Sequence, residues 1–377
     1  MKFLNVIFDD STGGESKVFR AISEHYQAEN LVIFDKKKNM VSEMIVYPMR
    51  FILNTLIKVN KDFGTFVSAI VSPLFLKRSY IRRFNFVLFN SSSMAIPATE
   101  NLIAVVYTPP RALSDRYSDT LELIEARNKF YVPLFMISSS LLNAVYRISA
   151  SNRKDLVCIS GNVRERLRKY YGVDCCVVYP FINVNDYKCT AFSPFFLYVS
   201  RINPGKRQHL SIDAFKLFYE GKRSFRLVIA GTVDNTEHSR RYLEELKKMS
   251  LGFPVEFVFS PSNEEVREMY ANCYLTLFSA QNEDFGLAPL ESMASGKPVI
   301  ALNEGGPKET IINGTTGFLV DDIEGMAERM AYLADNIEET ISMGKRGREH
   351  VEKNFSPESF FTKIDRLIQS SLEKDKK

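Results

Sequence analysis

The sequence predicts an α/β protein built from two doubly wound domains. The chain has 377 residues, which is enough for two domains that each bury a core of ordinary size. Short apolar runs of strand length alternate with helical patterns along most of the chain. Several of these runs end in glycine-rich or polar turns, as parallel strands do where they face a ligand.

The first domain is predicted to begin with a strand at residues 2–8. The segment Asp9 to Ser16 follows, contains Gly13 and Gly14, and opens onto a helical pattern. A strand, a glycine loop and a helix form the opening unit of a doubly wound sheet. A glycine pair is also typical of a simple tight turn, so this loop alone does not establish a phosphate site. Further strands are expected at residues 31–35, 84–90, 102–107, 157–160 and 175–179, with a helix at 164–171.

A non-periodic stretch, residues 180–194, separates the two halves and is predicted to be a linker. Strands of the second domain are expected at residues 195–199, 225–230, 255–259, 275–278 and 298–301. From Ile323 the pattern is helical to the end, apart from a break at Asn354-Phe355-Ser356-Pro357.

The composition excludes several classes of protein. A hydrophobic content of 45% and a charged content of 25% are those of a soluble globular protein. A net charge of +4 is too small to indicate a nucleic-acid partner. The five cysteines form no Cys-x-x-Cys pair and the four histidines have no zinc spacing. We therefore expect buried free thiols in a reducing compartment and no metal site.

Basic residues concentrate in residues 36–95. This stretch contains ten lysines and arginines but only two acidic residues, and the basic residues are interleaved with apolar runs. Such a surface can lie on an anionic bilayer, although core helices with a solvated basic face give the same pattern and are the favoured interpretation. No transmembrane helix is predicted: the uncharged stretch at residues 130–146 is 17 residues long and contains Pro133, whereas a span needs about 20. The N-terminus enters a strand without a signal-peptide pattern. We expect a cytoplasmic protein. The basic stretch at residues 36–95 adds the alternative of a peripheral contact with the inner face of the cell membrane.

The most informative segment is Glu283-Asp-Phe-Gly286-Leu-Ala-Pro-Leu-Glu291, which reads as a loop that becomes a helix. Pro289 suits a first helical turn, and Gly296 stands where a helix would stop. A helix N-terminus offers unpaired N–H groups to a phosphate, and carboxylates accept hydrogen bonds from sugar hydroxyls. Glu283 and Glu291 could therefore meet opposite ends of a nucleotide-sugar. The alternative is that they are a helix cap and a solvated helix residue.

Two cations, Arg201 and Lys206, follow the strand at residues 195–199. At a turn from strand to helix they can converge on a diphosphate, the arginine as a fork and the lysine as a point charge. As isolated charges they would be ordinary surface residues.

Taken with Gly305-Gly306 and Thr316-Gly317-Phe318-Leu319-Val320, these motifs resemble the donor site of retaining GT-B glycosyltransferases of the group-one (family four) class, nearest to its mannosyltransferase-like branch. The resemblance implies two Rossmann-like domains facing across a cleft. It divides the chain into an acceptor-binding domain at 1–182, a linker at 183–194, a donor-binding domain at 195–355, and a C-terminal helix with a tail at 356–377 that returns to the first domain.

The same resemblance assigns roles to residues. It makes Glu283, Arg201 and Lys206 catalytic, with Glu283 on the donor hexose and the two cations on the diphosphate. The implied donor-binding residues are Gly13, Gly14, Gly231, Phe259, Ser260, Phe285, Gly286, Leu287 and Glu291. Contacts to sugar or acceptor fall on Tyr107, Arg111 and Glu15, where Tyr107 stands in place of the histidine usual in one branch of the family.

The function implied is transfer of a hexose from a donor of the GDP-mannose or UDP-glucose type to a glycan or lipid-linked acceptor. The resemblance further implies retention of anomeric configuration and no metal or other cofactor. A dehydrogenase is disfavoured because Gly-x-Gly-x-x-Gly does not follow the first strand. A GT-B epimerase or phosphorylase shares the architecture, but the first needs no acceptor and the second needs a pyridoxal lysine. A non-catalytic subunit that binds nucleotide-sugar or a partner transferase is the alternative, since Tyr107 departs from the family pattern.

Overall fold

The structure is a computed structural model, and it describes residues 2–8, 14–35, 38, 40–45, 47–59, 75, 77–91, 102–127, 129–150, 156–220, 224–234 and 236–374. The chain forms two compact units: Met1–Pro180 with Thr362–Lys377, and Phe181–Phe361. Each contains one six-stranded sheet whose neighbouring strands are all parallel.

The first unit has a sheet of order β2-β1-β5-β6-β7-β8 and a small antiparallel pair, β3 and β4. Its strands are β1 (Phe3–Ile7), β2 (Glu29–Val32), β3 (Phe34–Asp35), β4 (Met40–Val41), β5 (Phe86–Ser91), β6 (Leu102–Val106), β7 (Leu156–Cys158) and β8 (Cys176–Val177). Its helices are α1 (Gly14–Tyr26), α2 (Tyr47–Val59), α4 (Arg78–Ile81), α5 (Tyr117–Arg127), α6 (Tyr131–Ala150) and α7 (Gly161–Tyr171), with a 3-10 turn η2 at Arg111–Leu113. Each strand expected for this half is present, and the second expected strand is split into β2 and β3.

The second unit has a sheet of order β11-β10-β9-β12-β13-β14. Its strands are β9 (Phe195–Val199), β10 (Arg226–Gly231), β11 (Val255–Phe259), β12 (Leu275–Phe278), β13 (Val299–Leu302) and β14 (Gly317–Val320). Its helices are α8 (Gln208–Tyr219), α9 (Glu237–Met249), α10 (Asn263–Asn272), α11 (Leu287–Ala294), α12 (Pro307–Thr310), α13 (Ile323–Asp335) and α14 (Ile337–Asn354), with 3-10 turns η3 (Val184–Asp186) and η4 (Pro204–Lys206).

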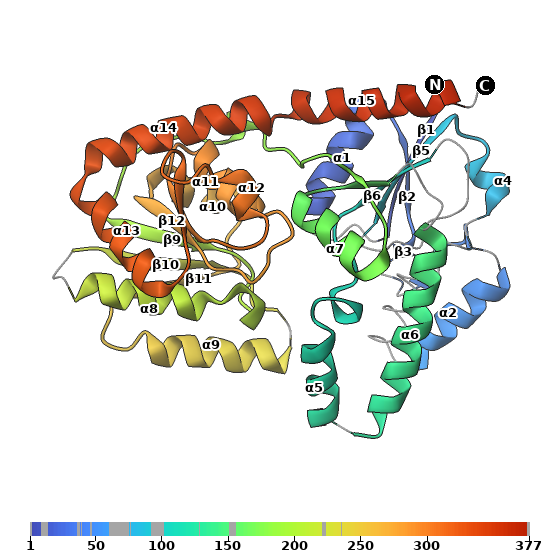
Figure 1. Cartoon of the computed structure of the whole chain (residues 1–377), viewed down its shortest axis with the longest axis horizontal. Coiled ribbons are helices and arrows are strands. Elements are labelled where there is room, and N and C mark those ends of the chain that lie inside the picture. The colour runs from blue at the N-terminus through green and yellow to red at the C-terminus, as the bar shows by residue number, and fades with distance from the viewer. Residues whose placement is uncertain are drawn as a thin grey trace. The chain divides into compact units, whose positions relative to one another are not determined.

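The core of the second unit lies on both faces of its sheet. This is expected from its continuously apolar strands, since parallel sheets are covered on both faces. Phe196 and Tyr198 of β9 are fully buried, as are Phe215 of α8 and Met330 of α13, and all four belong to one cluster. In Figure 1, α8 and α9 lie on one side of this sheet, and α10 and α11 on the other.

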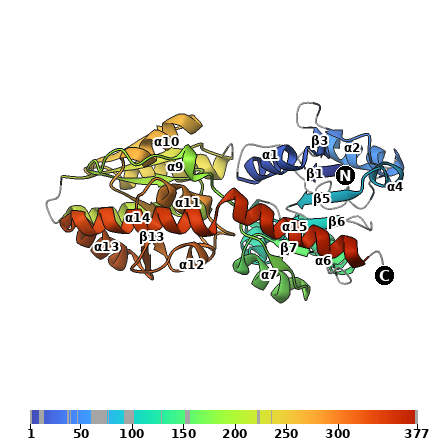
Figure 2. The ribbon, with the colours of Figure 1, turned by 90° about the horizontal axis from the view of Figure 1, so that it is seen from above.

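The last helix, α15 (Pro357–Lys374), begins after the break expected from the sequence. From Thr362 onward the chain belongs to the first unit, as the resemblance implied. There the hydroxyl of Tyr26 in α1 donates a hydrogen bond to Asp365, at 2.7 Å. Figures 1 and 2 show this part of α15 with α1 and the first sheet. The assignment of acceptor and donor binding to the two parts of the chain stays a prediction.

The expectation that all cysteines are free thiols is wrong for one pair. Cys158 and Cys175 form a disulfide, with Cα atoms 6.0 Å apart. The sequence pattern did not reveal it because the two residues are brought together by the pairing of β7 with β8, in which Cys158 lies opposite Val177. Of the remaining cysteines, Cys176 and Cys189 are exposed and Cys273 is buried.

Candidate functional site

The candidate site lies where the strand order of the second sheet changes direction. Counted from β9, the order is 3-2-1-4-5-6, and β9 and β12 are the central neighbours from which the chain winds outward both ways. In open α/β sheets, ligands bind beyond the carboxyl ends of the strands at such a point. The loop after β9 carries Arg201 and Lys206, and the loop after β12 carries Glu283.

Backbone hydrogen bonds tie these two loops together. The buried hydroxyl of Tyr198 accepts from the backbone N–H of Ser279, at 3.2 Å, and donates to the carbonyl of Lys206, at 2.5 Å. The backbone N–H of Gln281 donates to the carbonyl of Gly205, at 2.9 Å. Lys206 therefore stands on a backbone that is held against the neighbouring strand end.

Lys206 and Glu283 form a direct ion pair. The Lys206 Nζ donates to Glu283 Oε2 at 2.6 Å, and both side chains are largely buried. A charge-assisted hydrogen bond of this length orients both groups. The structure thus brings together two of the three residues to which the resemblance gave a catalytic role.

The glutamate loop is further held by the turn after β13. The backbone N–H of Gly306 donates to the carbonyl of Glu283, at 2.8 Å. A Cβ atom on Gly306 would lie 2.2 Å from the carbonyl oxygen of Phe285, which is closer than atoms can approach. Only glycine allows this close approach of the two backbones.

Helix α11 begins directly after this loop, with Gly286 as its N-cap residue. Gly286 has φ 86° and makes no side-chain cap hydrogen bond, and the first turn contains no acidic residue. The N–H groups at Gly286 and Leu287 thus have no side-chain cap, and a helix terminus of this kind attracts an anion. As expected, the helix stops before Gly296, whose N–H donates to Met293.

Arg201 points to a different carboxylate. Its Nη1 lies 3.4 Å from Asp234 Oδ1, and its side chain is 68% exposed. Asn203 holds the second oxygen of Asp234, at 2.7 Å. The two cations thus have separate partners: Arg201 pairs with Asp234, which follows β10, and Lys206 pairs with Glu283, which follows β12.

Glu291 is held by two tyrosine hydroxyls. Tyr187 donates to its Oε1 at 3.0 Å, and Tyr270 to its Oε2 at 3.3 Å. Burial, with the charge of Glu291 next to it, raises the pKa of both phenols, so both stay protonated donors. The orientation of Glu291 is therefore set by these phenols.

The remaining predicted donor-binding residues lie around the ends of β10 and β11. Gly231 pairs with Phe259 across these strands, and the N–H of Ser260 donates to the carbonyl of Gly231, at 3.0 Å. Ser260 has φ 51° and the ring of Phe259 is exposed. Phe285, in contrast, is a core residue that packs on the ring of Phe355, so its side chain cannot contact a ligand and only its backbone can.

The predicted residues of the first unit give fewer contacts. Gly13 lies outside the described residues, Gly14 begins α1, and Glu15 follows it in the first turn. Tyr107 is buried, and its hydroxyl donates to Asn90 Oδ1 at 3.3 Å. The side-chain amide of Asn90 in turn donates to Asn5 Oδ1, at 2.6 Å, so Tyr107 is part of a buried polar network.

Arg111 is paired within its own turn rather than open to a ligand. Its Nη2 and Nε donate to Asp115 Oδ2, at 2.8 and 3.1 Å. Burial alone would raise the pKa of Asp115. The guanidinium groups of Arg111 and Arg166 nevertheless hold this pKa below its usual value. The contact of Arg111 with acceptor or phosphate stays a prediction.

Sequence reasoning missed the groups that orient the predicted ones. They are Tyr187, Tyr198, Asn203, Asp234, Tyr270 and Ser279. Asp234 could have been suspected, because it follows a glycine turn at a strand end. The tyrosines carry no such signal.

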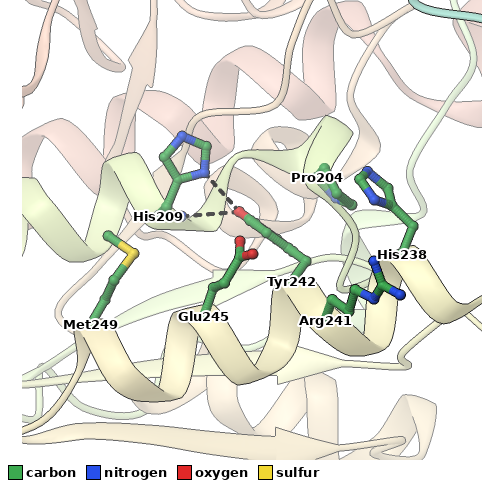
Figure 3. A pocket seen from close by; sticks show the side chains of 7 residues that line it. All are labelled: Pro204, His209, His238, Arg241, Tyr242, Glu245 and Met249. Atoms are coloured by element: carbon green, nitrogen blue, oxygen red, sulfur yellow. Dashed lines mark hydrogen bonds between the residues drawn. The ribbon is translucent and has the colours of Figure 1, made fainter. Parts of the chain in front are cut away.

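A pocket of about 520 Å³ lies beside this site, between η4, the start of α8 and helix α9 (Figure 3). The hydroxyl of Tyr242 accepts the backbone N–H of His209 at 3.1 Å and lies 2.9 Å from Nδ1 of the same residue. It therefore caps the N-terminus of α8, where Arg207 makes no side-chain cap. The pocket contains none of the predicted site residues.

The described part of the chain contains no group of three or more His, Cys, Asp or Glu side chains that could hold a metal ion. None of its helices is both long and apolar enough to cross a membrane.

Part of the chain is similar in sequence to known proteins. Residues 191–350 match the family described as glycosyl transferases group 1. The chain is 27% identical over 278 residues to alpha-1,3/1,6-mannosyltransferase ALG2 of Dictyostelium discoideum, covering 61% of this chain and 66% of that protein. It is 29% identical over 231 residues to the human protein of the same name, covering 55% and 56%. The chain thus spans only part of the length of these relatives.

Solved structures share the fold over the whole chain. Sucrose-phosphate synthase from Thermosynechococcus elongatus superposes with a TM-score of 0.71 at 16% identity, covering 99% of this chain and 100% of that one. Anabaena HepE in complex with UDP-glucose gives a TM-score of 0.67 at 16% identity, covering 99% of each chain. At such identity the likeness concerns the fold, which is GT-B. The sequence match lies in the unit that carries Lys206 and Glu283, so residues 191–350 are similar to the group 1 glycosyl transferases.

Proposed function

We propose that this chain is a glycosyltransferase that moves a hexose from a nucleoside-diphosphate sugar to a glycan or lipid-linked acceptor. The observation that carries the proposal is the Lys206–Glu283 ion pair at the carboxyl ends of β9 and β12, beside the uncapped start of α11. A cation and a helix N-terminus suit a diphosphate, and a carboxylate suits sugar hydroxyls. All of these groups lie within the second unit.

The chemistry that follows is differential stabilisation. As the bond from sugar to diphosphate breaks, the diphosphate gains negative charge. Lys206, Arg201 and the N–H groups at Gly286 and Leu287 would oppose that charge, a role that a divalent metal fills in other transferases. We therefore propose transfer without a metal. Loss of one such donor typically costs about 10²–10³ in rate.

Glu283 would hold hydroxyls of the donor hexose and Glu291 those of the ribose. We propose retention by front-face attack, because the sequence places no second carboxylate of the first domain as a nucleophile. Isolation of a sugar bonded covalently to a side chain would contradict this mechanism.

The names of the relatives favour mannose from a GDP donor, since both are called mannosyltransferases. A UDP-glucose donor is the alternative, because the HepE structure contains UDP-glucose. We further propose that the protein acts at the inner face of the cell membrane, with contact through residues 36–95. In the described part of that stretch, Arg50 of α2 lies 5.8 Å from the ring centroid of the exposed Tyr47.

The first test is a thermal-shift panel of nucleoside diphosphates and their sugars on the wild type and on Lys206→Ala. A ligand at 100 times its Kd adds about 2.7 kcal/mol to stability, which is easily measured. We expect GDP or UDP compounds to stabilise the wild type and to lose that effect in the variant.

Lys216→Ala is the matched control, because Lys216 is a partly buried lysine of the same unit, paired with Asp213 at 3.4 Å. It should keep the ligand-induced shift. If no nucleotide stabilises the wild type, the donor site is not functional and the proposal fails.

The alternative function is a non-catalytic subunit that binds nucleotide-sugar. The burial of Tyr107 and its hydrogen bond to Asn90 favour it, because a buried phenol cannot replace a histidine beside the transferred sugar. Slow donor hydrolysis by the purified protein, abolished in Lys206→Ala, would support the enzyme. Nucleotide binding without hydrolysis or transfer to any glycan acceptor would support the subunit.

A further inference from the structure

Helix α6 exposes a continuous apolar stripe to solvent. Leu134, Ile137 and Leu141 are 56%, 69% and 66% exposed, and Ile148 lies further along the same stripe. Their spacing of three, four and seven residues places them on one side of an α-helix. We call Leu134, Ile137, Leu141 and Ile148 the outer face of α6.

The opposite side of α6 already faces the core. Ser139, Leu142, Tyr146 and Ala150 are buried there. Helix α6 is therefore apolar on two sides, of which one is buried and the other, the outer face, is exposed. An apolar helix face of about four turns is normally buried against a partner or a membrane.

Helix α2 shows the same combination on a shorter helix. Tyr47, Phe51 and Ile52 are exposed large apolar side chains in its first two turns. Both helices thus offer apolar side chains to whatever covers them.

The charges on α2 and α6 have one sign. Their sequences contain Arg50, Lys58 and Arg147 and no aspartate or glutamate. The neighbouring helix α5 does carry acidic residues, of which Asp119 lies 3.2 Å from Arg116 and Glu125 lies 3.8 Å from Lys129. Cationic helices with an exposed apolar face complement an anionic lipid surface, where the apolar side chains enter the acyl region and the cations meet phosphate groups.

We propose that the outer face of α6, together with the apolar side chains of α2, docks the first unit onto an anionic lipid bilayer. The contact is interfacial, and α6 lies on the membrane rather than across it. The membrane contact proposed above for residues 36–95 thereby gains a second helix, α6. The docking rests on the proposed function in one respect: its purpose would be to reach a lipid-linked acceptor.

A second copy of the chain is the rival occupant of this face. A twofold interface would bring the same cationic helices of two copies together, and like charges oppose that pairing. An anionic bilayer has no such penalty. The bilayer is therefore the occupant that the charges favour.

The test is cosedimentation of the full chain with vesicles of phosphatidylcholine, with and without phosphatidylglycerol. We expect binding that needs the anionic lipid and weakens as salt is raised. The variant Ile137→Ser/Leu141→Ser should bind about tenfold more weakly or worse, since each exposed side chain loses apolar area that the bilayer would bury. Arg50→Gln/Lys58→Gln should weaken binding to the anionic vesicles in particular.

The matched control is Leu251→Ser/Ile341→Ser, which removes two exposed apolar side chains from the second unit. It should bind vesicles like the wild type. Because Ile137 and Leu141 are exposed, the α6 variant should keep the wild-type melting temperature and its nucleotide-induced shift. That shift reports on the donor site separately, so the docking proposal and the proposed function can fail independently.

Three results would overturn the proposal. Equal vesicle binding by the wild type and the α6 variant would remove the outer face of α6 from the contact. A wild type that does not bind vesicles but forms dimers, with the α6 variant monomeric in sedimentation velocity, would assign the face to a second copy. A wild type that does not bind, with an α6 variant that melts at lower temperature, would mean that another segment of this chain covers the face.

Discussion

At the scale of single residues, the candidate site depends on side chains that bind one another before any ligand is present. Lys206 and Glu283 satisfy each other at 2.6 Å, and Glu291 is held by two phenols. A donor that enters must offer Lys206 a phosphate and Glu283 a hydroxyl in exchange for their mutual bond. This preorganised pair explains how a charged site remains folded without ligand, since an unpaired buried charge is costly.

The backbone contact at Gly306 yields a prediction at this scale. Gly306→Ala should destabilise the protein by about 3 kcal/mol, because its Cβ would overlap the carbonyl of Phe285 and displace the glutamate loop. It should also reduce the nucleotide-induced thermal shift. Urea unfolding and the thermal-shift panel measure the two effects.

Gly314→Ala is the control for this substitution. Gly314 has φ +75° and its Cβ would meet nothing within 4 Å, so the change costs only backbone strain of about 1 kcal/mol. It should leave nucleotide binding intact. Equal losses of stability in the two variants would show that the close approach at Gly306 is not needed.

At the scale of elements, the start of α8 depends on helix α9. The Tyr242 hydroxyl accepts the N–H of His209 and lies 2.9 Å from His209 Nδ1 (Figure 3). Burial raises the pKa of Tyr242 to about 12, so the phenol keeps its proton. The phenol can donate that proton to Nδ1 of a neutral His209.

A pH dependence follows from this contact. Burial lowers the pKa of His209 below its usual 6.5, with Arg207 adding to the effect and Asp213 and Glu245 opposing it. As pH falls through 6.5, the unfolded chain takes up a proton that the folded chain resists, so folding stability falls with pH until the folded-state pKa is passed. His209→Gln should remove this part of the loss.

The measurement is urea unfolding of the wild type and His209→Gln between about pH 7 and pH 5. The wild type should lose more stability than the variant over that range. The pKa of His350 is also lowered by burial, but His350 is present in both proteins and cancels in the comparison. Parallel curves for the two proteins would mean that His209 does not titrate differently on folding.

At the scale of the whole molecule, the proposal joins a donor site in one unit to a bilayer contact in the other. Lys206, Glu283 and the start of α11 belong to Phe181–Phe361, and the outer face of α6 belongs to the unit that contains the first sheet. Loss of either function should leave the other measurable. This separation allows the two proposals to be tested on the same protein preparation.

The prediction for the intact protein concerns metal. With Lys206, Arg201 and the α11 terminus opposing the charge of the leaving diphosphate, EDTA should change the rate of donor turnover by less than about twofold. The assay is release of nucleoside diphosphate with and without EDTA. A loss of about a hundredfold, restored by Mg²⁺ or Mn²⁺, would assign that charge to a metal and refute the cation-only account.

The sequence was enough to predict every strand of the two six-stranded sheets except β14, in the correct order. The bounds expected for β9, β11 and β12 are those observed, because a short apolar run between polar turns has few other ways to bury itself. The start of α11 and its end before Gly296 were likewise predictable from proline and glycine. The motif around Glu283 was recognisable because its function requires residues that are close in the chain.

Which distant side chains contact one another is visible only in the folded structure. Lys206 and Glu283 are 77 residues apart, and Tyr187 and Glu291 are 104 apart. These contacts arise from the order of strands in the sheet and from the loops at their ends, which periodicity does not encode. The same reason accounts for the burial of Phe285, the bond between Cys158 and Cys175, and the partner of Arg201. Motifs made of neighbouring residues can be recognised in the sequence, whereas the pairing of distant side chains depends on how the parallel strands are arranged side by side.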